Sequence, residues 1–385
     1  MTQRIIFFCF VILTIVSCRE EEGIISSTDT DVTQGSSVES IKGFFLLNEG
    51  NMGNNKATLD YFDYETGIYT KNIYAERNPG VVKEMGDVGN DLQIYGNKLY
   101  AVINCSHFVE VMDVETAKHI TQISIPNCRY LAFDKGYAYV SSYAGPVQLD
   151  PNARLGYVAK VDTTSMAVVD TCTVGYQPEE MVIKGTKLYV ANSGGYRFPN
   201  YDNTVSVIDL NTFKEIKKIE VAINLHRMEI DSNGYIYVSS RGDYYDVPSK
   251  TLIIDSKTDK VVGEIDNLPN SEMTLCGDSL YVYSTEWSYH TNSNTITYAI
   301  YDTNLHKIVT RNFITDGTEK DIKIPYGVAV NPETKEFFVT DAKNYVTPGK
   351  LHCYSPNGVR KWSVTTGDIP AHFAFTRKRL KPLQH

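Results

Sequence analysis

The chain has 385 residues, of which 42% are hydrophobic and 22% charged, and its formal net charge is −9 at pH 7. This acidic balance argues against nucleic-acid binding, because no stripe of basic residues is available to displace the counterions of a phosphate backbone. Tyrosine is the most abundant aromatic residue, with 27 copies against 15 Phe and 2 Trp. Tyrosine fits the pleated, half-buried surface of a β-sheet, so the composition favours a globular protein rich in strands.

Residues 1–17 form the first predicted element and have the shape of a signal peptide. Arg4 precedes an apolar stretch, Ile5 to Val16, that is too short to span a bilayer. The stretch ends in Ile15-Val16-Ser17-Cys18, which resembles a lipobox. The resemblance implies that residues 1–17 are removed and that Cys18 is acylated. A plain secretory peptide with an incidental cysteine is the alternative.

A short acidic run follows the cysteine. The residues Arg19-Glu20-Glu21-Glu22 resemble the export signal that sends lipoproteins of Bacteroidetes to the outer face of the outer membrane. An acidic tether that faces the periplasm is the alternative. Residues 23–41 show no hydrophobic period, so the sequence predicts that residues 18–42 are a lipidated cysteine and a flexible acidic tether.

A strand pattern with an aromatic residue recurs seven times after residue 42, and successive aromatic residues are 39 to 57 positions apart. They are Phe45, Tyr100, Tyr139, Tyr189, Tyr237, Tyr281 and Phe338. This spacing is typical of four-stranded propeller blades, which take about 40–50 residues each. The strand after each copy mostly ends in Asp, as in Val207-Ile-Asp209. We expect this carboxylate to bind the amides of a tight hairpin and not to act in catalysis.

The innermost strand of each blade precedes the aromatic pattern, and only six such strands are found before the seven patterns. The seventh candidate lies at the far end of the chain, at Ala371-His-Phe-Ala-Phe375. The sequence therefore predicts an all-β fold, a seven-bladed β-propeller over residues 43–376 whose C-terminal strand closes the first blade. Residues 377–385 are predicted to be a solvated basic tail.

Five cysteines remain when the two within residues 1–18 are set aside. Cys105 and Cys128 fall in neighbouring predicted loops, where an oxidising exterior would permit a disulfide. An odd count leaves at least one thiol free. The other three cysteines lie in strand-like runs and are expected to be small core residues; they are Cys172, Cys276 and Cys353.

The connections between the second and third strands of the blades are long and unlike one another. In a propeller they share one face with the links between blades, and variable loops on a rigid scaffold are where function concentrates. Tyr, Asn and Ser dominate these loops and combine rigid aromatic area with adaptable hydrogen bonding, which indicates a wide, shallow site for a partly planar, partly polar ligand. The predicted ligand-binding residues are Asn48, Glu49, Asn51, Tyr143, Tyr196, Arg197, Tyr201, Arg241, Tyr244, Tyr245, Trp287, Tyr289, Tyr326 and Tyr345.

Enzyme motifs are absent from the sequence, which has no HExxH, GxSxG, P-loop or paired-cysteine metal site. We therefore expect no catalytic residues, no metal and no cofactor. Hydrogen-bonded or solvated side chains are favoured over metal ligands for the loop histidines, which are His107, His226, His290 and His372. A lactonase- or lyase-like enzyme is an alternative, and its candidate residues, without assigned roles, are Glu49, Arg154, Glu179, Arg197, Arg227, Arg241 and Glu286.

Two segments resemble known families. Leu188-Tyr-Val-Ala-Asn-Ser-Gly194 resembles the YVTN repeat of YncE-like propellers. The opening Leu46-Leu-Asn-Glu-Gly-Asn-Met-Gly53, together with the acidic lipoprotein start, resembles the surface cobalamin-binding lipoproteins of Bacteroidetes (BtuG-like). That resemblance implies a lipid-anchored protein of the cell surface that binds cobalamin or a related corrinoid as a ligand. It would pass this ligand to a TonB-dependent vitamin B12 transporter of the outer membrane.

Two other functions stay open beside the enzyme. One is a surface propeller that binds or processes glycans, since aromatic platforms also stack on sugar rings. The other is a structural subunit of an outer-membrane transporter. Aromatic contacts from all around the loop face would favour a corrinoid, whereas a compact cluster of carboxylates or histidines would favour an enzyme.

Overall fold

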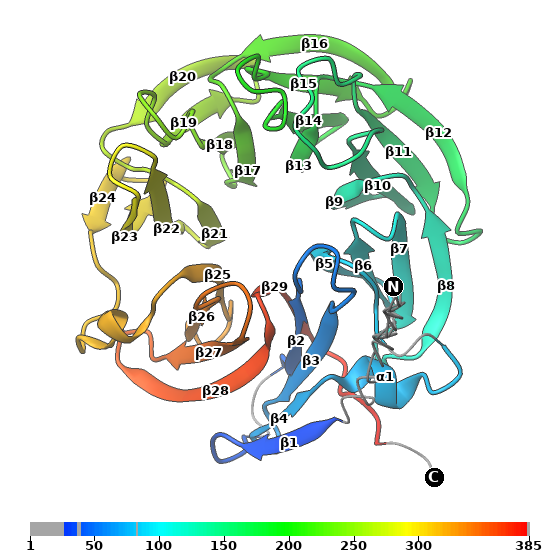
Figure 1. The fold of residues 1–385 in the computed structure, drawn as a ribbon, viewed down its shortest axis with the longest axis vertical. Helices are drawn as coiled ribbons and strands as arrows, with labels where there is room; N and C mark the ends of the chain where they lie inside the picture. The colour runs from blue at the N-terminus through cyan, green and yellow to red at the C-terminus, as the bar shows by residue number, and fades with distance from the viewer. Residues whose placement is uncertain (1–26, 37–39, 82–83, 383–385) are drawn as a thin grey trace, which may run out of the picture.

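The computed structural model describes residues 27–36, 40–81 and 84–382, and its strands form seven antiparallel sheets arranged in a ring (Figure 1). The predicted fold, an all-β propeller with seven blades, is therefore confirmed. The predicted signal peptide, Cys18 and the acidic run after it lie outside the described residues. Among the residues described, no helix has the length and apolar character needed to cross a membrane.

Blades A to G are named in chain order. Each blade has four strands, named below in order from the axis to the rim, and blade A has one further strand at its rim. Blade A consists of β29 (Pro370–Thr376), β2 (Gly43–Asn48), β3 (Thr58–Asp63), β4 (Ile68–Lys71) and β1 (Thr28–Asp31). Blades B and C consist of β5 (Gly89–Tyr95), β6 (Lys98–Ile103), β7 (Phe108–Asp113) and β8 (His119–Ser124), and of β9 (Cys128–Asp134), β10 (Tyr137–Ser142), β11 (Tyr157–Asp162) and β12 (Val168–Thr173).

The remaining blades follow the same order. Blades D and E consist of β13 (Pro178–Lys184), β14 (Lys187–Asn192), β15 (Thr204–Asp209) and β16 (Lys214–Glu220), and of β17 (Leu225–Ile230), β18 (Tyr235–Ser240), β19 (Lys250–Asp255) and β20 (Lys260–Ile265). Blades F and G consist of β21 (Glu272–Cys276), β22 (Ser279–Ser288), β23 (Ser293–Asp302) and β24 (Lys307–Thr310), and of β25 (Pro325–Val330), β26 (Phe337–Asp341), β27 (Pro348–Tyr354) and β28 (Arg360–Asp368). The links after β4 and β24 contain the short helix α1 (Ile73–Arg77) and the 3-10 helix η1 (Thr318–Asp321).

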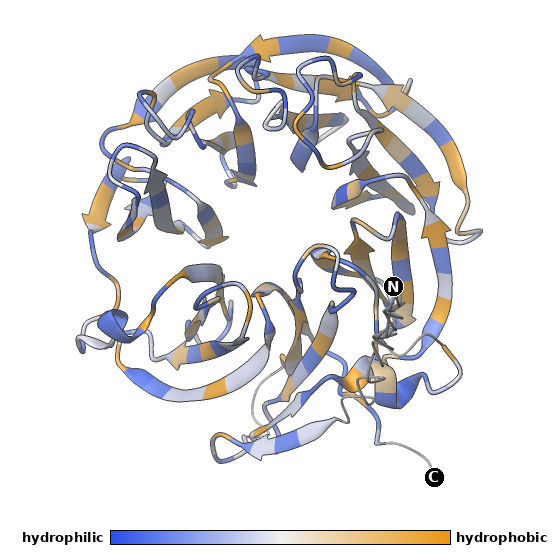
Figure 2. Cartoon of the chain, in the orientation of Figure 1, coloured by the Kyte–Doolittle hydropathy of each residue, from blue (hydrophilic) through white to orange (hydrophobic). Residues whose placement is uncertain are grey.

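The hydrophobic core lies between neighbouring blades, and apolar and polar residues alternate along the strands (Figure 2). Tyr189 of blade D, for example, belongs to the same cluster as Met228 of blade E. All seven aromatic residues of the predicted repeat are buried, with at most 9% of their surface exposed. Burial of such a side chain contributes about 1.5–3 kcal/mol, so one aromatic residue per blade secures each blade against its neighbours.

Strand β29 closes the ring, as predicted. It pairs antiparallel with β2, with Phe44 opposite Phe375 and Leu46 opposite Phe373. The ring of Phe44 also lies 4.8 Å from that of Phe338 in blade G, measured between centroids. The first and last blades therefore share one aromatic cluster, and the two ends of the propeller meet in one sheet.

The repeated aspartates have the predicted structural role. In six blades the carboxylate accepts a hydrogen bond from the backbone amide two residues later, at 2.8–3.1 Å. These residues are Asp63, Asp113, Asp162, Asp209, Asp255 and Asp302. Ser355 takes this place in blade G, where its hydroxyl accepts a hydrogen bond from the amide of Val359 at 3.2 Å.

One part of the predicted flexible tether is structured. Residues 28–31 form β1, which pairs with β4 so that Thr28 lies opposite Lys71 and Asp31 opposite Ile68. A strand of four residues is too short to produce a hydrophobic period in the sequence. It forms because the outer edge of β4 offers unpaired backbone groups.

The basic tail, predicted to be solvated, lies along blades A and B and makes contacts there through Arg379, Leu380 and Lys381. Leu380 is buried, Arg379 donates a hydrogen bond to Asp63 Oδ2 at 3.1 Å, and Lys381 forms an ion pair with Glu115. The basic side chains of the tail nevertheless remain exposed to solvent, and their acidic partners lie far away in the sequence.

All five cysteines within the described residues are free thiols. The disulfide considered between Cys105 and Cys128 is therefore not formed. The Cys128 thiol is buried and donates to the carbonyl of Phe108 at 3.3 Å. Cys172 and Cys353 are buried, as expected for small core residues, whereas Cys276 is only half-buried.

Candidate functional site

The innermost strands bring polar side chains to the axis because most of them begin with a β-bulge. The pairing register shifts near the start of β5, β9, β13, β17 and β25. A bulge sets two residues against one on the partner strand and re-aims side chains, so that consecutive residues can face the axis together. Such consecutive residues are Arg129 and Tyr130, Glu179 and Glu180, and His226 and Arg227.

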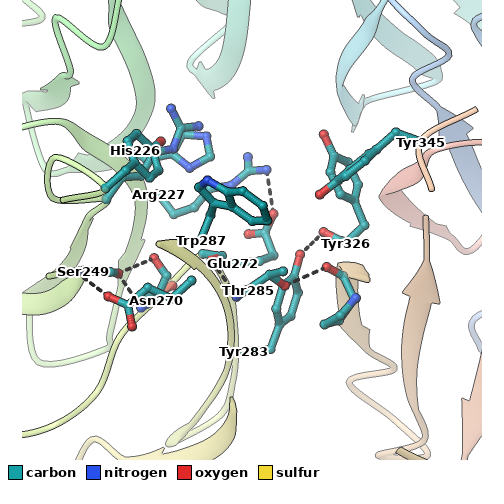
Figure 3. A pocket seen from close by; sticks show the side chains of 15 residues that line it. His226, Arg227, Ser249, Asn270, Glu272, Tyr283, Thr285, Trp287, Tyr326 and Tyr345 are labelled. Carbon is teal, nitrogen blue, oxygen red and sulfur yellow. Dashed lines mark hydrogen bonds and ion pairs between the residues drawn. The ribbon is translucent and has the colours of Figure 1, made fainter. Parts of the chain in front are cut away.

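Two hollows on the loop face meet at the axis, and we call them together the axial funnel. The first has a volume of 280 Å³ and lies among blades E, F and G (Figure 3). The second has a volume of 310 Å³ and is lined by residues of the other four blades and of blades E and G. Residues common to both are His226, Arg227, Arg241 and Tyr326. All seven blades therefore contribute to the funnel.

Glu179 is fully buried beside the funnel and pairs with the guanidinium groups of Arg129 and Arg241. Arg129 donates two hydrogen bonds to Glu179 Oε2, at 3.1 and 3.0 Å, and the hydroxyl of Tyr143 donates to Oε1. Arg241 Nη1 lies 3.8 Å from the same Oε1. Burial alone would raise the pKa of Glu179, but the charges of Arg129 and Arg241 outweigh it and hold this pKa below its usual range.

Arg227 stands between two carboxylates from neighbouring blades. Its Nη2 lies 2.6 Å from Glu272 Oε2, and its Nη1 lies 3.5 Å from Glu180 Oε1 (Figure 3 shows the pair with Glu272). Burial raises the pKa of both carboxyl groups, against the attraction of Arg227. One arginine therefore links the innermost strands β13, β17 and β21 at the axis.

Tyr130 and His226 form a neutral pair between the arginines. The Tyr130 hydroxyl and His226 Nε2 are 2.9 Å apart. The guanidinium carbons of Arg129 and Arg227 lie 5.6 and 5.1 Å from the centroid of the Tyr130 ring. Burial lowers the pKa of His226 well below its usual value, and the charges of Arg241, Arg227 and Arg129 add to this effect. His226 is therefore a neutral imidazole at physiological pH.

Glu49 connects the closing strand to the site. Its Oε1 lies 3.0 Å from His372 Nε2 on β29, and its Oε2 accepts a hydrogen bond from the Tyr326 hydroxyl of blade G at 2.7 Å. The closing strand therefore positions a loop residue of the funnel as well as completing blade A.

An exposed chain of aromatic rings, the aromatic ridge, runs over blades D, E and F. It consists of Tyr201, Phe198, Tyr245, Tyr289 and Trp287, with neighbouring centroids 6.1, 6.1, 4.9 and 6.0 Å apart. Tyr245 and Tyr289 are stacked at an interplanar angle of 19°, and about half of each side chain is exposed. Trp287 also lines the first hollow, so the ridge runs into the funnel.

Most of the predicted binding residues gather in these two places. Those in the funnel are Glu49, Tyr143, Tyr196, Arg241, Tyr244, Trp287, Tyr326 and Tyr345. Those on the ridge are Tyr201, Tyr245 and Tyr289, next to Trp287.

Three predicted residues have other places. Asn48 is completely buried and donates to Thr58 Oγ1 at 3.0 Å, the same structural bond that Asn192 makes to Thr204 in blade D. Asn51 and Arg197 line neither hollow. The guanidinium of Arg197 instead lies 3.5 Å from the centroid of the Tyr176 ring.

Sequence reasoning missed Arg129, Tyr130, Glu180 and Glu272, which line the axis. Their signal was present, because a polar or charged residue repeatedly begins the innermost strands. Alternation in a regular strand would point only one residue of each consecutive pair to the axis. The bulges that admit both members were not predicted.

No group of three or more His, Cys, Asp or Glu side chains in the described part of the chain is arranged to hold a metal ion. The funnel instead offers guanidinium groups, phenol hydroxyls and a neutral imidazole at its base. An aromatic surface stands at its side. These groups can stack against a planar ligand and donate hydrogen bonds to its oxygen atoms.

The fold and the site define a seven-bladed β-propeller with a polar, arginine-lined funnel on its axis. The chain belongs to the family DUF5074, described as a domain of unknown function, whose model matches residues 42–375. No curated protein matches the sequence. A similar solved structure is the hydrazine synthase of Kuenenia stuttgartiensis, which is 17% identical with a TM-score of 0.54 over 70% of this chain and 77% of that chain. At this identity, the likeness shows a common propeller fold alone.

Proposed function

We propose that this protein is a surface lipoprotein that binds cobalamin or a related corrinoid on the axial funnel and the aromatic ridge. It then passes this ligand to a TonB-dependent transporter of the outer membrane. The observation that carries the proposal is the junction of the ridge and the funnel at Trp287. A corrin is broad and flat and carries amide arms, so it needs an aromatic surface beside a polar hollow.

The distribution of aromatic residues supports a broad ligand. Tyrosine or tryptophan side chains from blades C, D, E, F and G line the funnel, and they include Tyr143, Tyr196, Tyr244, Trp287 and Tyr345. Three carboxylates beside the funnel, those of Glu179, Glu180 and Glu272, are by contrast held by arginines. A rigid surface with many preorganised contacts reduces the ordering cost of binding.

Cyanocobalamin gives a direct test, because it is coloured. The purified protein is mixed with it and passed over a desalting column, and we expect the protein fractions to be red. Colourless protein fractions would overturn the proposal. An exposed stack such as Tyr245 and Tyr289 would also suit a sugar ring, so retention of an oligosaccharide in place of the corrinoid would establish the glycan-binding alternative.

Variants locate the site. We expect Trp287→Ala to weaken cyanocobalamin binding about 5–150-fold, since an aromatic contact that the ligand buries contributes about 1–3 kcal/mol. Tyr137→Ala is the matched control, because Tyr137 lies at the start of β10, the end remote from Tyr143 and the loop face. Equal affinities of both variants and the unaltered protein would move the site elsewhere.

The anchor and the partner need separate measurements. Mass spectrometry of the protein from membranes should find an acylated Cys18 at the N-terminus, and Cys18→Ala should release the protein from the membrane fraction. Protease added to intact cells should degrade the protein if it faces outward. The transporter should co-purify with the protein from detergent extracts, and its absence there would contradict the proposed transfer.

A further inference from the structure

The base of the axial funnel carries hydrogen-bond donors without partners. Arg227 Nε and His226 Nδ1 are buried and have no hydrogen-bond partner among the described residues. His226 and Arg227 are 6% and 7% exposed, and both line the two hollows that form the funnel. Figure 3 shows these two side chains extending into the hollow beside Trp287.

Arg241 adds a third group of donors at the same place. It lines both hollows, and its guanidinium makes no hydrogen bond with any described residue. Its contact with protein charge is the ion pair with Glu179, at 3.8 Å. Glu179 is already bound by two hydrogen bonds from Arg129. Two arginines thus face one carboxylate, and the positive charge of Arg241 is only partly balanced.

The neutral histidine completes the donor set. When the Tyr130 hydroxyl donates to His226 Nε2, the imidazole proton lies on Nδ1, the atom that has no partner. A buried donor without a partner costs about 1–3 kcal/mol. Such groups are retained where a ligand satisfies them.

We propose that Arg227, Arg241 and His226 form a subsite for an oxyanion of the ligand, a phosphate ester. The guanidinium of Arg241 can bind two phosphate oxygens as a pair. Arg227 adds its Nε, since its two Nη atoms already face Glu272 and Glu180. The assignment deepens the proposed corrinoid function and rests on it. Cobalamin carries one phosphodiester, in its nucleotide loop, whereas cobinamide lacks that loop. The subsite would therefore select complete corrinoids.

The test compares the two corrinoids on the same protein. Dissociation constants for cyanocobalamin and dicyanocobinamide are measured by titration calorimetry. We expect the unaltered protein to bind cobinamide about 10–100-fold more weakly, the range for loss of charge-assisted hydrogen bonds. Arg241→Gln should reduce this ratio to about threefold or less, because it removes the charge that recognises the phosphodiester. The control is Arg377→Gln, because Arg377 lies on the exposed tail and pairs with Glu333. This variant should leave the ratio unchanged.

The outcomes separate the subsite from the proposed function. Equal binding of both corrinoids, or an equal loss for both in Arg241→Gln, would overturn the subsite and leave corrinoid binding intact. If neither corrinoid binds, the proposed function fails, and inorganic phosphate then tests the subsite alone. We expect phosphate to raise the melting temperature of the unaltered protein by roughly 1–3 °C above chloride at equal ionic strength, and not that of Arg241→Gln. No difference between the two anions would overturn the subsite as well.

Discussion

Replacement of Glu179 by Gln tests whether the charged network beside the funnel exists as described. The carboxylate is fully buried and receives two hydrogen bonds from Arg129 and one from Tyr143. Glutamine has nearly the same shape but no charge, so it leaves the Arg129 guanidinium, whose side chain is 12% exposed, facing a neutral group. The variant therefore isolates the charge of the pair from its packing.

The expected loss is large because the remaining charge is buried. Breaking a buried ion pair by removing one partner costs about 3–5 kcal/mol. Glutamine keeps one oxygen acceptor and Arg241 stays nearby, so we expect about 3 kcal/mol, at the lower end of that range. In a chain of this size that corresponds to a fall of roughly 3–6 °C in melting temperature. Glu264→Gln is the matched control, since its ion pair with Lys250 is half exposed and contributes about 1 kcal/mol at most.

Unfolding in guanidinium chloride, followed by tryptophan fluorescence, gives the free energies of unfolding of the unaltered protein and of Glu179→Gln. The pH dependence of their difference tests whether the charge of Glu179 stabilises the fold. The folded pKa of Glu179 lies below its ordinary value of 4.5. Its contribution is therefore present above pH 4.5 and is lost as the pH falls through the folded pKa. The difference between the two proteins should shrink below pH 4.5. A loss under about 0.5 kcal/mol at pH 7 would refute the buried pair, because an exposed pair gives that value.

Three further predictions address the axis, the ridge and the ring. Burial raises the pKa of Glu229, on the innermost strand β17, to about 7, so the protein loses stability as the pH rises from about 4.5 to 7. Glu229→Gln should therefore unfold at a higher temperature than the unaltered protein at pH 8 but not at pH 4. Combined replacement of Tyr244, Tyr245 and Trp287 by Ala should weaken corrinoid binding in calorimetry while the melting temperature changes little. Unaltered affinity would show that the ridge is not part of the binding site. Deletion of residues 370–385 should abolish the cooperative melting transition seen by circular dichroism, since blade A would lose its innermost strand.

The sequence was sufficient for the fold because each blade repeats the same chemistry. The buried aromatic residues, such as Tyr189, occupy one position in every blade, and the turn aspartates, such as Asp209, occupy one position in six of the seven blades. The count of the aromatic residues therefore predicts the number of blades. Closure was predictable as well, because the pattern at residues 371–375 has no partner nearby in the chain. Contacts without a repeat, such as Arg379 with Asp63, could not be predicted.

The site was predicted only in part, for a reason that lies in the bulges. Loop residues such as Tyr143 and Trp287 were found because loop length and composition mark the functional face. Asn48, which lies outside both hollows and is buried in blade A, was included because a polar residue that ends a strand and one that begins a loop look alike in sequence. Arg129 was missed because the register of β9 shifts near its start. A single inserted residue in a ladder leaves no compositional signal.

Closure of the ring and construction of the site depend on the same strand. His372 lies on β29 and holds Glu49, whose other oxygen accepts the hydrogen bond of Tyr326 from blade G. Loss of β29 would therefore release the funnel wall together with blade A. A His372→Ala variant removes only the contact to Glu49 and keeps the backbone pairing of β29 with β2. If that variant melts within a few degrees of the unaltered protein but binds its ligand more weakly, the strand positions the site directly, beyond its role in closing the ring.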